Sequence, residues 1–325
     1  MAKVKLQTKK KVVKKKAIKK AGKRSGADPT AGLGLSSRPS VRDLQLPDKP
    51  KEAHFDMQEY TILVYGREKI GKTIFFSSFP EALFLTTEPG TKNLEIFEFN
   101  ADDGACRNWA ILRKAVDLLE KTDRFKTVII DTVDRAYDMC LEYICEKRGI
   151  EYPGEDSAGR EDWGKSWKAV KLEFLELVHR ILQTGRGLCF TSHASEASIT
   201  AKNGDKYTRI HPSMSGQARK VVEALVDMFF YAEYVRTSDG STARVLITEG
   251  DETIWAGHRK CAYPLPRFVP ILEEGGYDLL KDAFNGKDVG LDPSTFMPSR
   301  RTTETAAKLI QKEKGKQALG KRKTR

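Results

Sequence analysis

Between residues 60 and 200, short apolar runs alternate with longer segments of helical periodicity. Four runs rich in β-branched and aromatic residues predict buried strands: YTILVYG (60–66), ALFLTTE (82–88), KTVIIDT (126–132) and GLCFTSH (187–193). Continuously apolar strands of this kind are typical of parallel sheets, which helices cover on both faces. The alternation therefore predicts an α/β domain with a mainly parallel central sheet flanked by helices.

Helical segments separate these strands. A short one, KTIFFSSF, follows the first strand and ends before Pro80, and two longer ones are predicted at 133–148 and 160–184. The last segment carries apolar side chains four and three positions apart, which puts them on one helix face. They are Trp163, Trp167, Val170, Phe174, Leu177 and Ile181. We expect this stripe to pack in the core or against a subunit rather than to stack on bases.

The second half of the body adds a hairpin and further strands. Residues 197–211, ASITAKNGDKYTRIH, have strand-like flanks around Asn203-Gly204, which predicts a hairpin with a type I′ turn. A helix at 215–227 is expected next. The strands DMFFYAEYV (227–235), ARVLITEG (243–250) and ETIWAGH (252–258) complete the predicted body, which shows no internal repeat.

Positive charge is concentrated at the two ends of the chain. Residues 1–24 contain eleven Lys and one Arg without an acid, and residues 300–325 carry a net charge of +8. Since the whole chain carries +12, the body between these ends is mildly acidic. Blocks of like charge bury too little apolar surface to fold, so both tails are expected to be disordered. They suit solubilisation, the binding of a polyanion such as nucleic acid, or a nuclear-import signal.

Composition also indicates how the chain is divided. Residues 25–59 are rich in Gly, Ser and Pro, which predicts a linker between a Lys-rich tail (1–24) and one α/β domain (60–285), with a basic C-terminal tail at 286–325. The five cysteines form no CxxC pair, the first thirty residues lack an apolar signal-like segment, and nowhere do eighteen apolar residues follow one another. We expect no zinc site and no membrane span, in a soluble, intracellular and reduced protein.

A glycine-lysine motif connects the first predicted strand to the first predicted helix. It consists of Gly66, Arg67, Glu68, Lys69, Ile70, Gly71, Lys72 and Thr73, with the spacing G-x-x-x-x-G-K-T. The spacing suits a phosphate chain, because glycines let backbone N–H groups wrap the phosphates and the helix N-terminus faces the anion. Lys72 is expected to reach the β- and γ-phosphates and the Thr73 hydroxyl to bind Mg²⁺. The sequence thus predicts a P-loop for ATP and Mg²⁺.

Polar residues end three other predicted strands at the same sheet edge. Asp131 ends KTVIIDT, where a carboxylate can hold Mg²⁺ beside Thr73, although an aspartate here can also cap the next helix. Glu88 ends ALFLTTE and is the candidate base for the attacking water; the alternative is an exposed turn residue. His193 ends GLCFTSH, as either a γ-phosphate sensor or a hydrogen-bonded strand-end histidine.

The order of five segments resembles the RecA/RadA-type recombinase core: YGREKIGKT, FLTTEPGTKNL, KTVIIDTVDRAYD, GLCFTSHASE and WAGHRKCAYPLP. More specifically, the chain resembles the phage-encoded RecA-fold P-loop ATPases known as phage nucleotide-binding proteins, of the single-strand annealing recombinase type. The resemblance covers residues 60–270. It implies ATP hydrolysis coupled to DNA binding in a homo-oligomer, in the cytoplasm of a bacterial host. The implied partners are single-stranded DNA and a single-strand DNA-binding protein.

The resemblance also assigns roles to single residues. Glu88 matches the water-activating glutamate and Asp131 the magnesium-site aspartate of such ATPases. Arg259 matches a basic residue near a subunit boundary that could reach a neighbour's γ-phosphate. The chain departs from the recombinase pattern at Thr86, where an Asp is common, and at Pro89, which interrupts a Glu-Gly step.

The predicted hairpin occupies the position of the DNA-contacting loop in this family. Lys202, Lys206 and Arg209 could contact DNA phosphates, and Tyr207 could stack on a base. A solvated hairpin with ordinary surface charges is the alternative.

Three functions fit these observations. The first is an Mg²⁺-dependent, DNA-binding ATPase that acts in phage recombination, single-strand annealing or replication. The second is a nucleotide-regulated assembly or loader protein with slow turnover, whose tails contact a protein partner. A stand-alone helicase motor is the third, and the sequence contains no further helicase motif.

Overall fold

The computed structural model describes residues 46, 48–53, 55–99, 106–201, 203–292, 294 and 296. Contacts divide the chain into two units, Met1–Ala53 and His54–Arg325, and every helix and strand of the described residues belongs to the second unit. The predicted Lys-rich tail, the first part of the linker and most of the basic C-terminal tail lie outside the described residues.

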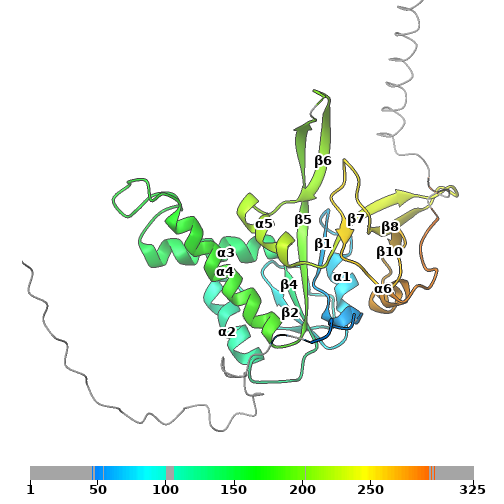
Figure 1. The fold of residues 1–325 in the computed structure, drawn as a ribbon, viewed down its shortest axis with the longest axis horizontal. Helices are drawn as coiled ribbons and strands as arrows, with labels where there is room; N and C mark the ends of the chain where they lie inside the picture. Colours follow the sequence, from blue (N-terminus) through cyan, green and yellow to red (C-terminus); the bar gives the residue numbers. More distant parts are fainter. Residues whose placement is uncertain are drawn as a thin grey trace, which may run out of the picture. The chain divides into compact units, whose positions relative to one another are not determined.

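One sheet forms the centre of the second unit (Figure 1). Its strands are β1 (Ile62–Gly66), β2 (Ala82–Thr86), β3 (Phe97–Glu98), β4 (Thr127–Asp131), β5 (Gly187–Thr200), β6 (Lys206–Pro212), β7 (Met228–Arg236), β8 (Thr242–Ile247), β9 (Gly257–His258) and β10 (Phe268–Pro270). Their order is β10-β8-β7-β1-β5-β4-β2-β3, with β6 beside β5 and β9 beside β7. Neighbours from β3 to β7 along this order are parallel, and the remaining pairs are antiparallel.

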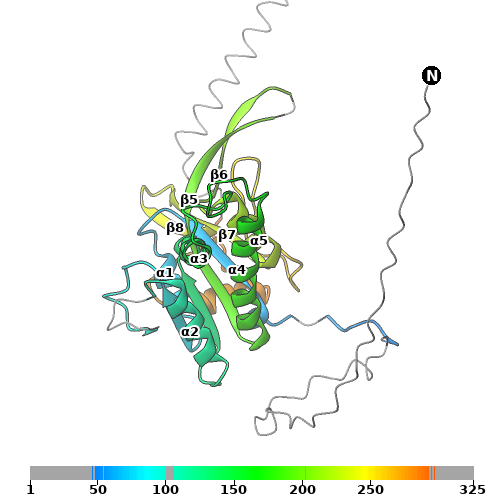
Figure 2. The same ribbon diagram turned by 90° about the vertical axis from the view of Figure 1, so that its left-hand side faces the viewer.

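Helices cover both faces of the sheet, as Figures 1 and 2 show. They are α1 (Lys72–Ser77), α2 (Trp109–Leu119), α3 (Val133–Arg148), α4 (Lys165–Gln183), α5 (Gly216–Leu225) and α6 (Gly276–Phe284), and a 3₁₀ helix, Met57–Glu59, precedes β1. Leu63 and Tyr65 of β1 pack with α2 to α5, whereas Ile62 and Val64 of the same strand pack with α1 and α6. Successive residues of a strand point to opposite faces, so a strand buried on both faces must be apolar throughout. The predicted α/β P-loop fold with a mainly parallel sheet is confirmed.

The helical stripe of α4 is buried only in part. Val170, Phe174, Leu177 and Ile181 lie in the core, as predicted. Trp163 lies before the helix and is 81% exposed, because α4 begins at Lys165 after Gly164 in a left-handed conformation. Trp163 is therefore not part of the core, and its packing against a subunit stays a prediction.

Strand β5 extends beyond the sheet and pairs with β6 from Ala194↔Pro212 to Thr200↔Lys206. We call residues 194–212 the arm; Figure 1 shows it projecting from the carboxyl edge of the sheet. Ala201 and Asp205 extend the pairing, since the Ala201 N–H donates to Asp205 O over 2.8 Å. The loop thus has three residues and ends at Gly204 with φ 85°, so the predicted two-residue type I′ turn is wrong although the hairpin is confirmed.

Candidate nucleotide-binding site

Two positions of the 66–73 motif require glycine, Gly66 because of a close approach to backbone and Gly71 because of its backbone conformation. At Gly66, where β1 ends, a Cβ would lie 2.6 Å from the carbonyl oxygen of Ala232 on the neighbouring strand β7. Gly71 caps the N-terminus of α1 with φ 103°, and a Cβ there would lie 2.8 Å from Nη1 of Arg244. Any larger residue at these positions would displace the loop or its neighbours, so the glycine spacing reflects packing as well as backbone conformation.

The Lys72 side chain bridges two backbone carbonyl groups at the start of the loop. Its Nζ donates to the carbonyl oxygens of Gly66 at 2.9 Å and of Arg67 at 2.8 Å. The side chain is buried, and burial lowers the pKa of Lys72, an effect that the nearby Asp131 carboxylate partly offsets. A cation held by neutral carbonyls at the start of a helix is well suited to receive phosphate oxygens.

Asp131 joins the P-loop to the neighbouring strands. Its Oδ2 accepts a hydrogen bond of 2.7 Å from the Thr73 hydroxyl at the start of α1. Its Oδ1 accepts one from the Thr191 hydroxyl of β5. Mg²⁺ prefers oxygen ligands and is usually bound through one or two carboxylates, with water and substrate phosphates completing the shell. The Thr73 and Asp131 oxygens fit such an ion.

Glu88, just after β2, meets His193, which lies within β5 at its last pairing position with β1. Oε2 of Glu88 lies 3.1 Å from Nε2 of His193, and its Oε1 accepts a hydrogen bond of 2.8 Å from the hydroxyl of Thr132, directly after Asp131. His193 pairs with Gly66 across the β1–β5 ladder, so the histidine lies beside the start of the P-loop. Nδ1 of His193 is buried without a partner among the described residues. The structure thus brings Lys72, Glu88, Asp131 and His193 to one sheet edge.

Asp134 is a member of this cluster whose role the sequence did not reveal. Its carboxylate accepts hydrogen bonds from the hydroxyls of Ser192 (3.0 Å) and Ser213 and from the backbone N–H of His193 (3.4 Å). Burial raises the pKa of Asp134, and the two serine hydroxyls oppose that effect. Ser192 and Ser213 flank the arm, so one carboxylate fastens both of its ends to the first turn of α3. The sequence offered no signal because Ser213 is 79 positions away.

Arg244 of β8 was also missed. Its guanidinium lies against Gly71 and forms an ion pair with Glu273, which follows β10. The N–H of Ile271 donates to the Arg244 carbonyl at 2.8 Å, which ties the segment after β10 to β8. In the sequence Arg244 was one charge within an apolar strand, and only the fold shows which loop it meets.

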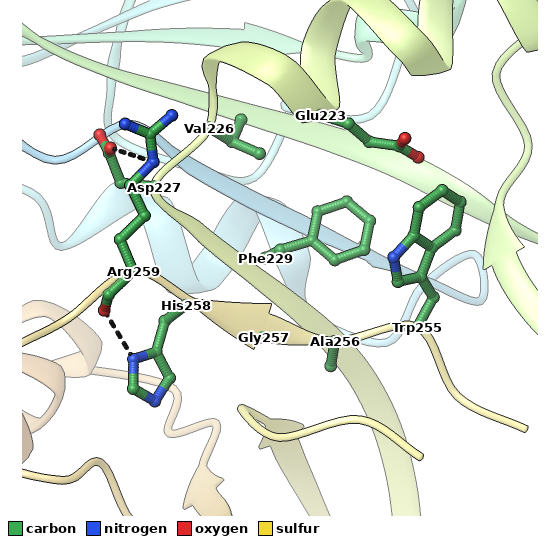
Figure 3. Close-up of a pocket in the computed structure, with 9 residues that line it drawn as sticks. All are labelled: Glu223, Val226, Asp227, Phe229, Trp255, Ala256, Gly257, His258 and Arg259. Atoms are coloured by element: carbon green, nitrogen blue, oxygen red, sulfur yellow. Dashed lines mark hydrogen bonds and ion pairs between the residues drawn. The ribbon is translucent and has the colours of Figure 1, made fainter. Parts of the chain in front are cut away.

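Arg259 lies away from the cluster. It follows β9, which pairs with the first residues of β7, and Nε of Arg259 lies 3.2 Å from Oδ1 of Asp227 (Figure 3). Since β7 runs parallel to β1, its first residues lie at the amino edge of the sheet, opposite the P-loop. Arg259 also borders a pocket of ≈300 Å³ together with Glu223, Phe229, Trp255 and His258. Within one chain, therefore, Arg259 does not face the P-loop.

The predicted DNA-contacting residues lie on the arm. Lys206 is exposed, the guanidinium carbon of Arg209 lies 5.7 Å from the centre of the Tyr207 ring, and Nε of Arg209 donates to the Glu252 carbonyl at 2.9 Å. Lys202 lies outside the described residues. These side chains belong to a separate surface that is joined to the cluster through β5.

The fold and the site define a class of protein. Three features define an α/β P-loop nucleoside triphosphatase domain. The loop after β1 has P-loop spacing, its lysine is buried against the loop's own carbonyls, and an aspartate on a nearby parallel strand contacts the start of α1. The chain belongs to the AAA domain family, which matches residues 58–260. This match includes every described residue of the cluster and the arm.

Comparisons with individual proteins give more distant similarities. The chain is 25% identical over 156 residues to the SPbeta prophage-derived uncharacterized protein YorG of Bacillus subtilis (strain 168), a match that covers 46% of this chain and 43% of YorG. It thus spans less than half of that relative's length. Among solved structures, the KaiC-like protein PH0186 of Pyrococcus horikoshii OT3 is 14% identical, with 67% of this chain and 88% of that chain covered and a TM-score of 0.36. No helix of the described residues is long and apolar enough to cross a membrane.

Proposed function

We propose that this protein is an Mg²⁺-dependent ATPase that couples ATP hydrolysis to the binding of single-stranded DNA, in phage recombination, single-strand annealing or replication. One observation carries the proposal. His193 contacts the candidate base Glu88, and the strand that holds His193 continues directly into the basic arm.

The P-loop residues bind the triphosphate in this proposal. Backbone N–H groups of residues 66–73 surround the phosphates, and the Lys72 ammonium leaves the Gly66 and Arg67 carbonyls to contact the β- and γ-phosphates. Thr73 and Asp131 hold Mg²⁺, which neutralises charge on the phosphate oxygens when bound.

Glu88 is proposed to act on the attacking water. Its carboxylate accepts a proton as the water oxygen bonds to the γ-phosphorus, and the bond from that phosphorus to the β–γ bridging oxygen breaks. Hydrogen bonds from Thr132 and His193 orient the two carboxylate oxygens. The His193 side chain contacts Glu88, and its backbone N–H contacts Asp134. Loss of the γ-phosphate on hydrolysis can therefore shift the residues from which the arm begins.

The arm is proposed to bind DNA. Lys206, Arg209 and Lys202 contact backbone phosphates, and Tyr207, with Arg209 beside its ring, stacks on a base. The Lys-rich residues 1–24 add contacts that do not depend on sequence. A single-strand DNA-binding protein is a further proposed partner, and the prophage origin in the name of YorG supports a phage context in the cytoplasm of a bacterial host.

A homo-oligomer is proposed to complete the site. Because Arg259 lies at the amino edge of the sheet, only a neighbouring copy could bring its 61% exposed side chain to a P-loop. An arginine supplied in this way stabilises charge on the transferred phosphoryl group.

The test is the steady-state rate of ATP hydrolysis with and without single-stranded DNA. We expect DNA to stimulate hydrolysis, and we expect the double variant Lys206→Ala/Arg209→Ala to lose the stimulation while keeping the basal rate. Lys287→Ala, at an exposed lysine paired with Asp282 over 2.8 Å near the end of α6, is the matched control. Hydrolysis that does not respond to DNA would contradict the coupling and favour a nucleotide-regulated loader.

A further inference from the structure

Arg244 is a second cation at the P-loop, and no motif assigns it a role. Its Nη1 lies 2.8 Å, and its Cζ 3.5 Å, from the position of a Cβ on Gly71. Gly71 is the N-cap of α1 and belongs to the 66–73 loop that is proposed to wrap the phosphates. The guanidinium thus lies beside the part of the loop that wraps phosphate, on the strand β8, two places from β1.

The strand order indicates which end of a nucleotide would lie near Arg244. The oxygens that suit Mg²⁺ belong to Thr73 and to Asp131 on β4, and β4 lies on the β5 side of β1. Strand β8 lies on the opposite, β7 side of β1. If the β- and γ-phosphates of a bound nucleotide lay toward Asp131, its α-phosphate and nucleoside would lie toward β7 and β8.

The surroundings of Arg244 leave Nη1 of its guanidinium available to an anion. Its side chain is 20% exposed, and its Nη2 pairs with Glu273, whose own side chain is 71% exposed at the rim of the site. The pairing of Ile271 with the Arg244 backbone keeps Glu273 near the guanidinium. A guanidinium carries five N–H donors and remains charged, so Nη1 can bind an oxygen while Nη2 keeps its carboxylate partner.

We propose that Arg244 binds the α-phosphate of the nucleotide held by the P-loop of the same chain. The proposal rests on the proposed nucleotide binding and adds a contact that ADP and ATP share. It differs from the roles of Lys72, which acts on the β- and γ-phosphates, and of Arg259, which would act from a neighbouring copy. Arg244 accordingly contributes to holding nucleotide both before and after hydrolysis.

The experiment compares the affinities of the full chain for ADP and for a non-hydrolysable ATP analogue, in the presence of Mg²⁺, by isothermal titration calorimetry. We expect Arg244→Ala to weaken both by the same factor, about 10-fold or more, as for loss of a hydrogen bond to a charged group. The matched control is Arg267→Ala, which removes another arginine paired with a carboxylate, Asp251, at 3.2 Å. The control should bind both nucleotides as the wild type does.

The other outcomes overturn the inference in distinguishable ways. A loss confined to the ATP analogue would indicate a γ-phosphate contact, and unchanged affinities would reduce Arg244 to a structural ion pair with Glu273. A wild-type protein that binds neither nucleotide would refute the proposed function itself. If Arg244→Ala does not fold, Arg244→Gln keeps most of the side-chain length without its charge, and the same equal loss for both nucleotides is expected.

Discussion

The Glu88 carboxylate lies 3.1 Å from Nε2 of His193, although the two residues are 105 positions apart in the chain. The contact joins the end of β2 to the strand that becomes the arm. A candidate catalytic group is therefore in direct contact with the strand that continues into the arm proposed to bind DNA, and each of the two can be changed separately.

Glu88→Gln should separate nucleotide binding from hydrolysis. Glutamine keeps the size of the side chain and an oxygen for the Thr132 hydroxyl, but it does not accept a proton from water at neutral pH. We expect ATP binding to persist and turnover to fall by about 10²-fold or more, the scale of losing a general base. Single-turnover hydrolysis checks this, with Glu81→Gln, at an exposed glutamate before β2 and 3.5 Å from Lys126, as control. A wild-type rate in Glu88→Gln would remove Glu88 from the mechanism.

Arg259→Ala should reduce turnover without unfolding the chain. The Arg259–Asp227 ion pair is largely exposed on the arginine side, and such pairs contribute about 0–1 kcal/mol to stability. If the arginine acts on a neighbour, mixing Arg259→Ala with Glu88→Gln protein should restore part of the activity at mixed interfaces. The measurement is the hydrolysis rate against mixing ratio, in oligomers shown to exchange subunits. Failure of every mixture to recover activity would exclude action on a neighbour.

Deleting residues 1–24 should change the salt dependence of DNA binding but not its nucleotide dependence. Twelve positive charges without an acid offer many phosphate contacts. If roughly half engage single-stranded DNA at about 0.7 per phosphate, the deletion should flatten the log–log salt slope by about 4.

Replacing Lys202, Lys206 and Arg209 by alanine should have the opposite effect. Nucleotide dependence should be lost, while the salt-sensitive binding by the tail remains. Salt titrations of both variants, with and without a non-hydrolysable ATP analogue, give the comparison. A deletion that leaves the slope unchanged would assign the tail to solubilisation or to a protein partner.

Glu223→Gln should stabilise the protein in a pH-dependent way. Among the described residues, Oε1 of Glu223 is buried without a hydrogen-bond partner, and Nε of Arg219 lies 4.0 Å from it (Figure 3 shows Glu223 beside the pocket). Burial raises the pKa of Glu223 above its unfolded value, so stability falls as pH rises through the folded-state pKa.

The glutamine variant avoids this loss. It should be more stable than the wild type at pH 8, and the difference should shrink toward pH 4. Urea unfolding at the two pH values measures it, and Glu146→Gln, at an exposed position of α3, should show no such trend. A difference that is equal at both pH values would mean that the charge of Glu223 is not the cause.

Local sequence patterns predicted the parts of the fold that depend on burial and spacing. The apolar runs gave β1, β2, β4 and β7, and the glycine spacing located the loop before α1, because these features follow from residues adjacent in the chain. Helix α2 was missed, although its buried Trp109, Leu112, Val116 and Leu119 have helical spacing. Helix α6 was missed too, since it begins at a glycine, Gly276, with another glycine, Gly275, as its N-cap.

The site could be predicted only as far as strand ends identify it. Glu88, Asp131 and His193 end predicted strands, and a parallel sheet brings such ends together. Asp134 and Arg244 could not be found in this way. The first depends on Ser213 across the arm, and the second depends on β8 lying two strands from β1 with Glu273 turned toward it. Both relationships arise from long-range packing that leaves no local pattern.

The continuity of β5 has a mechanical consequence. Its residues from Leu188 to Thr200 include neither glycine nor proline, so the strand has no built-in hinge between the sheet and the arm. Thr200, the last paired position of the arm on β5, lies seven residues beyond His193, which is roughly 23 Å at about 3.3 Å per residue. Over that length, a rotation of about 5° at His193 would move the tip of the arm by roughly 2 Å. A small rotation beside the proposed γ-phosphate position can thus become a larger displacement at the far end of the arm without any change in the hairpin's own conformation.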